Sequence, residues 1–366
     1  MAVGKFMQQA ATRDYSKFWQ KEGTFPYLLQ QPKPPIEGRP HSVRENYIRC
    51  VKGEQPWWMP AYFYESNTVW PDAMEEHPVP EVDGYDWWGV YWTMVEVVGG
   101  MITKPGTRTI SEFSKWKEEL EWPDLSVVDF ETDGKKLQQS LDPDRPHIYE
   151  SVEGIFERLH EMIPFDETLI AFYDEPELLE EFFQKMCDYK IESIQKICKY
   201  YGRIDGILYH DDWGTQRSGF FSNEMFDEQL MPATSRLTKF IKDSGLFLEL
   251  HSCGKNIQYL PEMLELGIDM WTPQKTINDP QYLHDNWGKK MTFAFQLEIP
   301  IEDDEQKIRK DVREFVDRFG ENGRVMCWIM TDMASDAEKA AKQGEIARDE
   351  LYNYSTEYYN KLYGRN

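Results

Sequence analysis

Two residue types that bind metals lie close together at the end of an apolar run. The stretch L-F-L-E-L-H-S-C-G covers residues 246–254 and places His251 two positions before Cys253. If the run is a buried strand, residues two apart point to the same side, so the imidazole and the thiol leave the strand together. Nitrogen and sulfur ligands of this kind suit zinc. A core histidine packed beside a buried thiol fits the same two residues.

A second thiol is available on a later strand. Cys327 lies inside R-V-M-C-W-I-M, with 73 residues between it and Cys253, and extends the pattern to H-x-C-x73-C. Three protein ligands with an open fourth position are typical of a catalytic zinc site, whereas a structural site normally has four. Cys327 is also compatible with a small apolar residue that packs within its strand.

The elements that position these residues alternate along the second half of the chain. Such alternation implies a parallel sheet wrapped by helices. The periodicity predicts strands at 147–151, 204–209, 246–250, 268–271, 291–295 and 325–330, and helices at 153–162, 176–201, 224–242, 256–266, 303–319 and from 335 onward.

The first part of the chain is less regular. Ser42 and Glu45 form a capping box for a short amphipathic helix that stops at Gly53, and the aromatic run after it is compatible with a first buried strand. Residues 1–41 end in a proline-rich stretch and are predicted to be an N-terminal extension. Residues 71–144 have little periodicity and are predicted to be a long insertion that serves as a lid.

Polar and aromatic side chains collect where the predicted strands end. Ligands in parallel α/β folds sit beyond the carboxyl ends of the strands, so these positions are read together. Asp212 is placed to act as a general acid or to position a substrate, and Asp211 is a candidate for the same task. His210 fits either a metal ligand or a hydrogen-bonded structural group. The candidate substrate-binding residues are Tyr62, Tyr64, Trp213 and Gln274, although the aromatic members also fit an ordinary core.

Three stretches resemble the uroporphyrinogen decarboxylase superfamily. S-V-R-E-N-Y-I-R-C-V-K-G-E-Q-P-W-W-M-P resembles the opening segment of that family, and D-D-W-G followed by F-S-N-E-M-F-D-E-Q-L-M-P resembles two later blocks. H-S-C-G-K-N-I-Q-Y-L-P-E-M-L-E-L-G-I-D-M-W is similar to the H-x-C-G-N block of the corrinoid-linked methyltransferases in that superfamily. The likeness runs from about residue 42 to the C-terminal helix and is poor within 71–144.

The resemblance implies a (β/α)8 TIM barrel over residues 42–366, with the active site at the C-terminal mouth. It also implies zinc on His251, Cys253 and Cys327, with Glu298 as a candidate fourth ligand. If the register near Cys327 is shifted, Thr331 takes the ligand position, and Glu298 or Asp212 completes the site.

The same resemblance implies a function. The expected enzyme is a zinc-dependent methyltransferase that moves a methyl group between a small substrate and the cobalt of a corrinoid (cobalamin) on a partner protein. The aromatic content of 14% favours a methoxylated aromatic as one candidate donor. The alternatives are a decarboxylase-like lyase and a non-catalytic barrel that binds a small ligand. Decarboxylation is disfavoured, because the segment from Met59 to Tyr64 lacks the arginines that bind a polycarboxylate in the true decarboxylases.

Charge and composition exclude other classes of protein. A formal net charge of −24 disfavours binding to nucleic acid or to an anionic membrane surface. No apolar run approaches the roughly 20 residues of a membrane span, and no signal peptide is recognisable, so a cytoplasmic protein is expected. Five cysteines are an odd number in a long chain, which favours reduced thiols over a disulfide framework.

Overall fold

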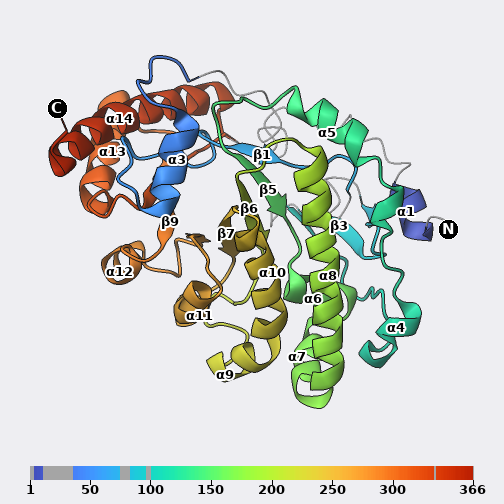
Figure 1. Ribbon diagram of the computed structural model, residues 1–366. Coiled ribbons are helices and arrows are strands. Elements are labelled where there is room, and N and C mark those ends of the chain that lie inside the picture. The colour runs from blue at the N-terminus through green and yellow to red at the C-terminus, as the bar shows by residue number, and fades with distance from the viewer. Residues whose placement is uncertain (1–3, 11–35, 75–82, 96–99, 334, 366) are drawn as a thin grey trace.

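The fold is built on a curled parallel sheet. The computed structural model describes residues 4–10, 36–74, 83–95, 100–333 and 335–365 (Figure 1). Its main sheet has seven strands whose spatial order is also their order along the chain. These strands are β1 (Asn67–Val69), β5 (His147–Ser151), β6 (Gly206–His210), β7 (Phe247–Ser252), β8 (Met270–Pro273), β9 (Thr292–Ile299) and β10 (Val325–Thr331). All neighbouring pairs are parallel, which confirms the predicted α/β class.

A segment that precedes β1 contacts the opposite edge strand of the sheet through a single bridge. Ala61 forms an isolated parallel bridge with Cys327 of β10. The backbone N–H of Cys327 donates to the carbonyl of Pro60 at 2.9 Å, and the N–H of Tyr62 donates to the carbonyl of Cys327 at 3.0 Å. The described residues therefore show seven parallel strands and one bridge, where the sequence predicted an eight-stranded barrel.

The expected first strand in the aromatic run is reduced to the bridge at Ala61, and a side chain accounts for the start of the run. Asn46, in α3 (Val43–Lys52), accepts hydrogen bonds from the backbone N–H groups of Trp57 and Trp58 at 2.7 and 3.3 Å. Its amide also donates to the carbonyl of Trp58 at 3.0 Å. These backbone groups are thus satisfied by a helix residue, and the described strand begins only at Asn67.

The side chains inside the curl form one cluster, which we call the inner cluster. It takes one apolar residue from each of six successive strands together with residues near the N-terminal end of the sheet, and comprises Tyr47, Cys50, Val51, Tyr62, Ile148, Leu208, Phe247, Met270, Ala294 and Met326. Residues at the alternate positions, such as Tyr209, Leu250 and Cys327, belong to the larger cluster between the sheet and the helices. Strand parity therefore separates an inner face from an outer face.

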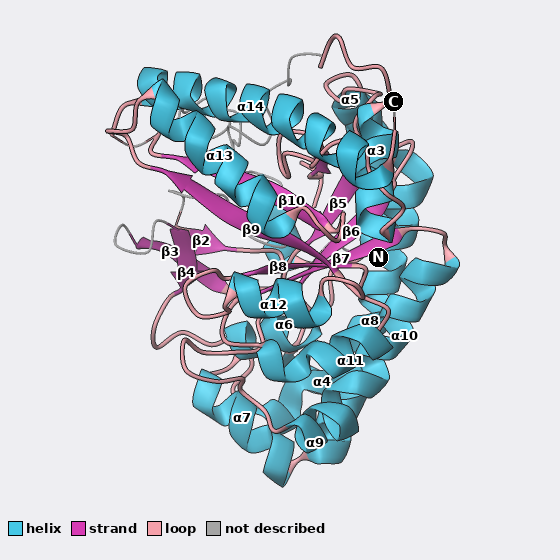
Figure 2. Cartoon of the chain, turned by 90° about the vertical axis from the view of Figure 1, so that its left-hand side faces the viewer, coloured by secondary structure: helices cyan, strands magenta, loops and turns pink. Residues whose placement is uncertain are grey.

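Helices cover the outer face (Figure 2). α13 and α14 pack together beside β9 and β10, and α10 packs on β7 and on α8. The helices of this layer are α6 (Ile155–Met162), α7 (Phe165–Asp174), α8 (Pro176–Tyr200), α9 (Asn223–Met225), α10 (Met231–Asp243), α11 (Leu260–Glu265), α12 (Pro280–Trp287), α13 (Glu305–Phe319) and α14 (Ala337–Tyr363). α7 and α12 were not anticipated from the sequence.

The described part of residues 71–144 has its own secondary structure. It contains the antiparallel strands β2 (Gly84–Tyr85), β3 (Tyr91–Val95) and β4 (Gly100–Thr103), followed by α4 (Trp116–Glu119) and α5 (Phe130–Gln138). Residues 75–82 and 96–99 of this predicted insertion, and residues 1–3 and 11–35 of the predicted N-terminal extension, lie outside the described residues. Within the predicted N-terminal extension, α1 spans Lys5–Ala10.

Candidate metal centre

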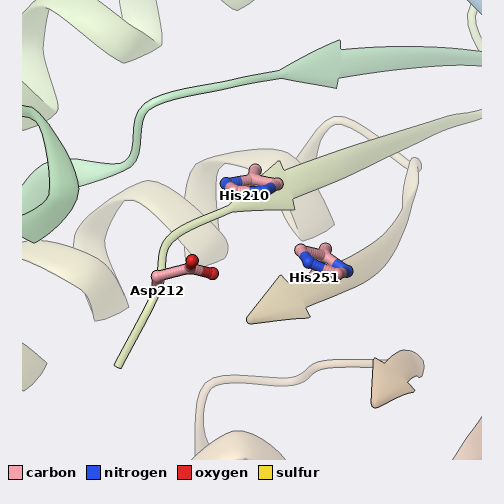
Figure 3. A group of neighbouring side chains, drawn as sticks. All are labelled: His210, Asp212 and His251. Atoms are coloured by element: carbon pink, nitrogen blue, oxygen red, sulfur yellow. The ribbon is translucent and has the colours of Figure 1, made fainter. Parts of the chain in front are cut away.

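Two histidines from neighbouring strands lie against each other at the carboxyl ends of β6 and β7. The parallel register pairs His210 with His251, and their rings stack with centroids 4.6 Å apart. Asp212 follows β6 and turns its carboxylate toward the same space (Figure 3). One ligand atom from each of these three residues lies within 4.8 Å of the others. The three form a group that can hold a metal ion.

The loops that carry these residues are tied together by hydrogen bonds. The backbone N–H of Cys253 donates to the Asp212 carboxylate at 2.5 Å. The N–H of Trp213 donates to the Ser252 hydroxyl at 3.0 Å. Asn256 in turn donates to the carbonyl of Cys253 at 2.7 Å. The position of Asp212 is therefore set by the backbone of the loop after β7.

Two glycines allow the loops to approach this closely. Gly254 has a φ of +95°, and a Cβ built there would lie 2.2 Å from the carbonyl carbon of Gly214. A Cβ at Gly214 would lie 2.5 Å from the Asn256 side chain. The glycines of D-D-W-G and H-S-C-G are thus required by a backbone contact between the two motifs.

The thiol of Cys253 lies beside the group. Its Sγ is 3.4 Å from Nε2 of His251. Burial, and then the Asp212 carboxylate, raise the pKa of this thiol. Burial, and then the neighbouring His210 ring, lower the pKa of His251 to about 4, so that ring is neutral at pH 7. A neutral imidazole is the form that binds a metal, whereas the thiol has to lose its proton to become a ligand.

His210 is held from the other side by Glu157, in α6. Nδ1 of His210 lies 2.8 Å from the Glu157 carboxylate. Burial opposes the charged ring, but Glu157 and other carboxylates outweigh that effect and raise the pKa of His210 well above its usual value. Burial also raises the pKa of Glu157 to about 8. The contact fixes the orientation of the imidazole.

Glu157 belongs to a second group of carboxylates, which we call the glutamate group: Glu153, Glu157 and Glu161. All three are buried, and one oxygen from each lies within 4.8 Å of the others. Glu161 pairs with Arg158 at 3.0 Å, and Arg158 also contacts Asp86 at 2.9 Å. Sequence reasoning did not single out these residues, although their spacing of four, directly after a predicted strand, would have placed them on one helix face.

The two predicted catalytic acids lie in different environments. Asp211 is fully buried and accepts hydrogen bonds from the Tyr209 hydroxyl at 2.8 Å and from the backbone N–H of Glu157 at 2.8 Å. Burial raises the pKa of Asp211 to about 6. Asp211 fastens the start of α6 to the end of β6, while Asp212 is the acid that lies beside the two histidines.

The predicted ligands on the last strands lie apart from this group. Cys327 is fully buried among the residues between the sheet and the helices. Thr331 lies near α14, since a Cβ at Gly344 would come within 3.9 Å of its methyl group. Glu298 is exposed and pairs with Lys275 at 3.3 Å. The structure therefore brings His251, Cys253 and Asp212 together, and adds His210 to them.

The predicted substrate-binding residues are dispersed. Tyr62 is buried in the inner cluster, and its hydroxyl donates to Glu249. Tyr64 stacks on the guanidinium of Arg348, in α14. Trp213 is fully buried and packs edge-on against Phe226.

Gln274 is the member of the set that lies next to the candidate metal centre. Its side-chain oxygen accepts from the N–H of Gly254 at 3.2 Å and from the amide of Gln216 at 3.1 Å. It joins the end of β8 to the loops that hold Asp212 and Cys253.

Comparisons with known proteins identify the family and the fold. Residues 132–326, which include β5 to the start of β10 and the whole candidate metal centre, match the family model for uroporphyrinogen decarboxylase (URO-D). The structure resembles that of a methyltransferase from Methanosarcina mazei with a TM-score of 0.57 and 12% sequence identity, over 85% of this chain and 99% of the other. A comparison with curated proteins finds no match. Among the described residues, no helix has the length and apolar character needed to span a bilayer.

Proposed function

Because the chain belongs to the uroporphyrinogen decarboxylase family, we propose that it is a zinc-dependent methyltransferase. The methyl group moves between a small substrate and the cobalt of a corrinoid on a partner protein. The observation that carries the proposal is the convergence of His251, His210 and Asp212 at the carboxyl ends of β6 and β7 (Figure 3), with the thiol of Cys253 lying 3.4 Å from Nε2 of His251. The structural likeness to a methyltransferase from Methanosarcina mazei supports methyl transfer as the reaction class.

The donor atoms fit zinc. Ligands at about 2.0–2.3 Å from zinc in a tetrahedral site lie roughly 3.3–3.8 Å from one another. The Nε2 of His251 and the Sγ of Cys253 are 3.4 Å apart, and the other donors lie within 4.8 Å of His251. Bound there, zinc would supply Lewis acidity to the oxygen or nitrogen of a methyl donor, or to a thiol acceptor.

The chain's own groups prepare the site for such a substrate. The loop after β7 fixes Asp212 through the N–H of Cys253, and Glu157 fixes the His210 ring. Held in this way, the Asp212 carboxylate can serve as a donor to the ion. Gln274 bridges the surrounding loops and has an amide that can orient a polar substrate group.

The test is methyl transfer to cobalt in solution. The full chain is mixed with cob(I)alamin and a panel of methoxylated aromatics, methylamines and methyl thioethers, and loss of the Co(I) absorption is followed. The reverse direction uses methylcobalamin with thiols. We expect one donor or acceptor to give turnover that zinc restores after chelation and that His251→Ala abolishes.

Two outcomes would contradict the proposal. Release of carbon dioxide from a porphyrinogen, with no methyl transfer, would identify a decarboxylase-like lyase. Tight binding of a small ligand without turnover in either direction, in protein loaded with zinc, would identify a non-catalytic barrel.

A further inference from the structure

The candidate donors that lie together at the ends of β6 and β7 differ from the H-x-C-x73-C pattern of the sequence. We propose that His210 and Asp212 complete the centre formed by His251 and Cys253, and that Cys327 takes no part in it. The set is then two imidazoles, one carboxylate and one thiolate. This inference rests on the proposed metal-dependent function and specifies its centre.

Strand parity excludes Cys327. On β10, Met326 belongs to the inner cluster, and Trp328 packs against that cluster. Cys327, between them, belongs to the cluster on the outer face. His251 has the same parity as Phe247, an inner residue of β7. The thiol of Cys327 and the imidazole of His251 therefore leave opposite faces of the sheet.

Cys327 also has a structural task that holds it in place. Its N–H and carbonyl form the two hydrogen bonds that join β10 to Pro60 and Tyr62. Turning its side chain inward would require rotation of this backbone and loss of both bonds. The same parity argument applies to Thr331, whose methyl group lies toward α14.

Strand parity places His210 on the same face of the sheet as His251, and Asp212 lies close to both. His210 has the parity of Leu208, an inner residue of β6, and the register places it directly beside His251. Asp212 lies two residues further along, and one of its oxygens lies within 4.8 Å of a ring nitrogen of each histidine.

His210 has the outer partner that a metal-binding histidine usually has. A metal-binding histidine normally uses its second ring nitrogen to donate to a carboxylate or a carbonyl. Nδ1 of His210 contacts Glu157 at 2.8 Å, which leaves its Nε2 for the metal. Nε2 of His251 lies 3.4 Å from Sγ of Cys253.

A zinc ion with four protein ligands can still bind a substrate atom. Catalytic zinc can expand to five ligands during the reaction, so a substrate atom can join without loss of a protein ligand. The glutamate group is the competing location for a metal ion. Glu161 already pairs with Arg158, and Glu157 with His210, so we assign that group to support of the centre.

The experiment measures metal binding in the full chain, independently of methyl transfer. Apoprotein prepared with a chelator is titrated with Zn(II), and the zinc-loaded protein is studied by X-ray absorption. We expect one zinc per chain and one sulfur scatterer among nitrogen and oxygen. His210→Ala and Asp212→Asn should each weaken zinc at least tenfold, whereas Cys327→Ala should leave the affinity within twofold. Glu157→Ala should weaken zinc about ten- to hundredfold, and Glu157→Gln, which keeps an acceptor oxygen, should restore most of the loss.

The outcomes separate this inference from the proposed function. Two sulfur scatterers, with zinc lost in Cys327→Ala but kept in His210→Ala and Asp212→Asn, would overturn the ligand set and leave a zinc enzyme standing. Loss of zinc in Glu161→Gln with normal binding in His251→Ala would move the metal to the glutamate group. If the wild-type protein binds no zinc, both the ligand set and the zinc-dependent function fail. Unaltered circular dichroism shows that each variant is folded.

Discussion

Replacement of Gly254 by alanine should disrupt the loops that hold the candidate metal centre, and Gly245 offers a matched control. Both glycines have a positive φ, +95° at Gly254 and +79° at Gly245, at opposite ends of β7. A Cβ at Gly245 meets nothing within 4 Å, whereas one at Gly254 would lie 2.2 Å from the backbone of Gly214. The pair separates the cost of the backbone conformation from the cost of the clash.

The two costs differ in magnitude. An alanine in the left-handed region costs about 1–2 kcal/mol, which is the whole expected effect of Gly245→Ala. In Gly254→Ala the neighbouring loop must also retreat from the new methyl group, which brings the total to about 3–5 kcal/mol. Because the neighbouring loop carries Asp212, zinc affinity should fall more than tenfold in Gly254→Ala and stay unchanged in Gly245→Ala.

Denaturant titrations of the zinc-free variants give the two stability losses, and zinc titrations give the affinities. If Gly254→Ala destabilises the protein no more than Gly245→Ala does, the two motifs do not make the backbone contact described above. If zinc affinity survives while stability falls, the contact is structural and does not position Asp212.

Three further changes test other parts of the structure. Burial raises the pKa of Glu65 from 4.5 to about 7. The contribution of this group to the free energy of unfolding therefore falls by about 3 kcal/mol as the pH rises from about 4.5 to about 7. Glu65→Gln keeps an acceptor for the indole N–H of Trp58, which donates at 2.8 Å, and should gain stability relative to wild type across that interval; a constant difference in urea midpoints would contradict the shifted pKa. Arg158→Met should lower the free energy of unfolding by about 3–5 kcal/mol, because it leaves the buried Asp86 and Glu161 without their shared cation. A decrease below about 1 kcal/mol in chemical denaturation would refute this prediction. Asp211→Asn should lower stability by about 2–3 kcal/mol by turning an amide toward the donors at the start of α6, while zinc affinity stays within twofold; the reverse pattern would make Asp211 a ligand.

Much of the fold could be predicted because its strands and helices have strong local patterns. The predicted strand at 147–151 coincides with β5, and the predicted helix at 176–201 differs from α8 by one residue. Ser42 caps α3 by accepting from the N–H of Glu45 at 3.3 Å, and Gly53 ends the helix with a φ of 70°, both as expected. These features depend on residues within a few positions of one another.

The features that could not be predicted depend on contacts between distant residues. The aromatic run at 54–64 is apolar enough for a strand, but Asn46 accepts from the backbone N–H groups of Trp57 and Trp58, and the run pairs with β10 through an isolated bridge at Ala61. The small antiparallel sheet β2–β3–β4 forms in a segment with little periodicity, where Asp86 accepts from the indole of Trp92 at 3.0 Å and from Arg158 of α6. Such contacts leave no signature in the spacing of residues.

The candidate site shows the same division. His251 and Cys253 were recognised because a local rule, two residues apart on one strand, places them together. The partnership of His210 with His251 is a property of the register between β6 and β7, and the role of Glu157 depends on how α6 lies on β6. The sequence supplies the residues for these contacts but not their pairing.

A ligand assignment in a parallel sheet has to satisfy parity as well as spacing. Along β10 the inner positions are 326 and 328, occupied by Met326 and Trp328, which pack on the inner cluster. A second thiolate on that strand would therefore have to occupy an even-numbered position near its carboxyl end. The chain has Met330 at that position, and it is 38% exposed. The donors that this chain does place on the inner face near His251 are the imidazole of His210 and the carboxylate of Asp212, which favours a centre with nitrogen and oxygen ligands and a single sulfur.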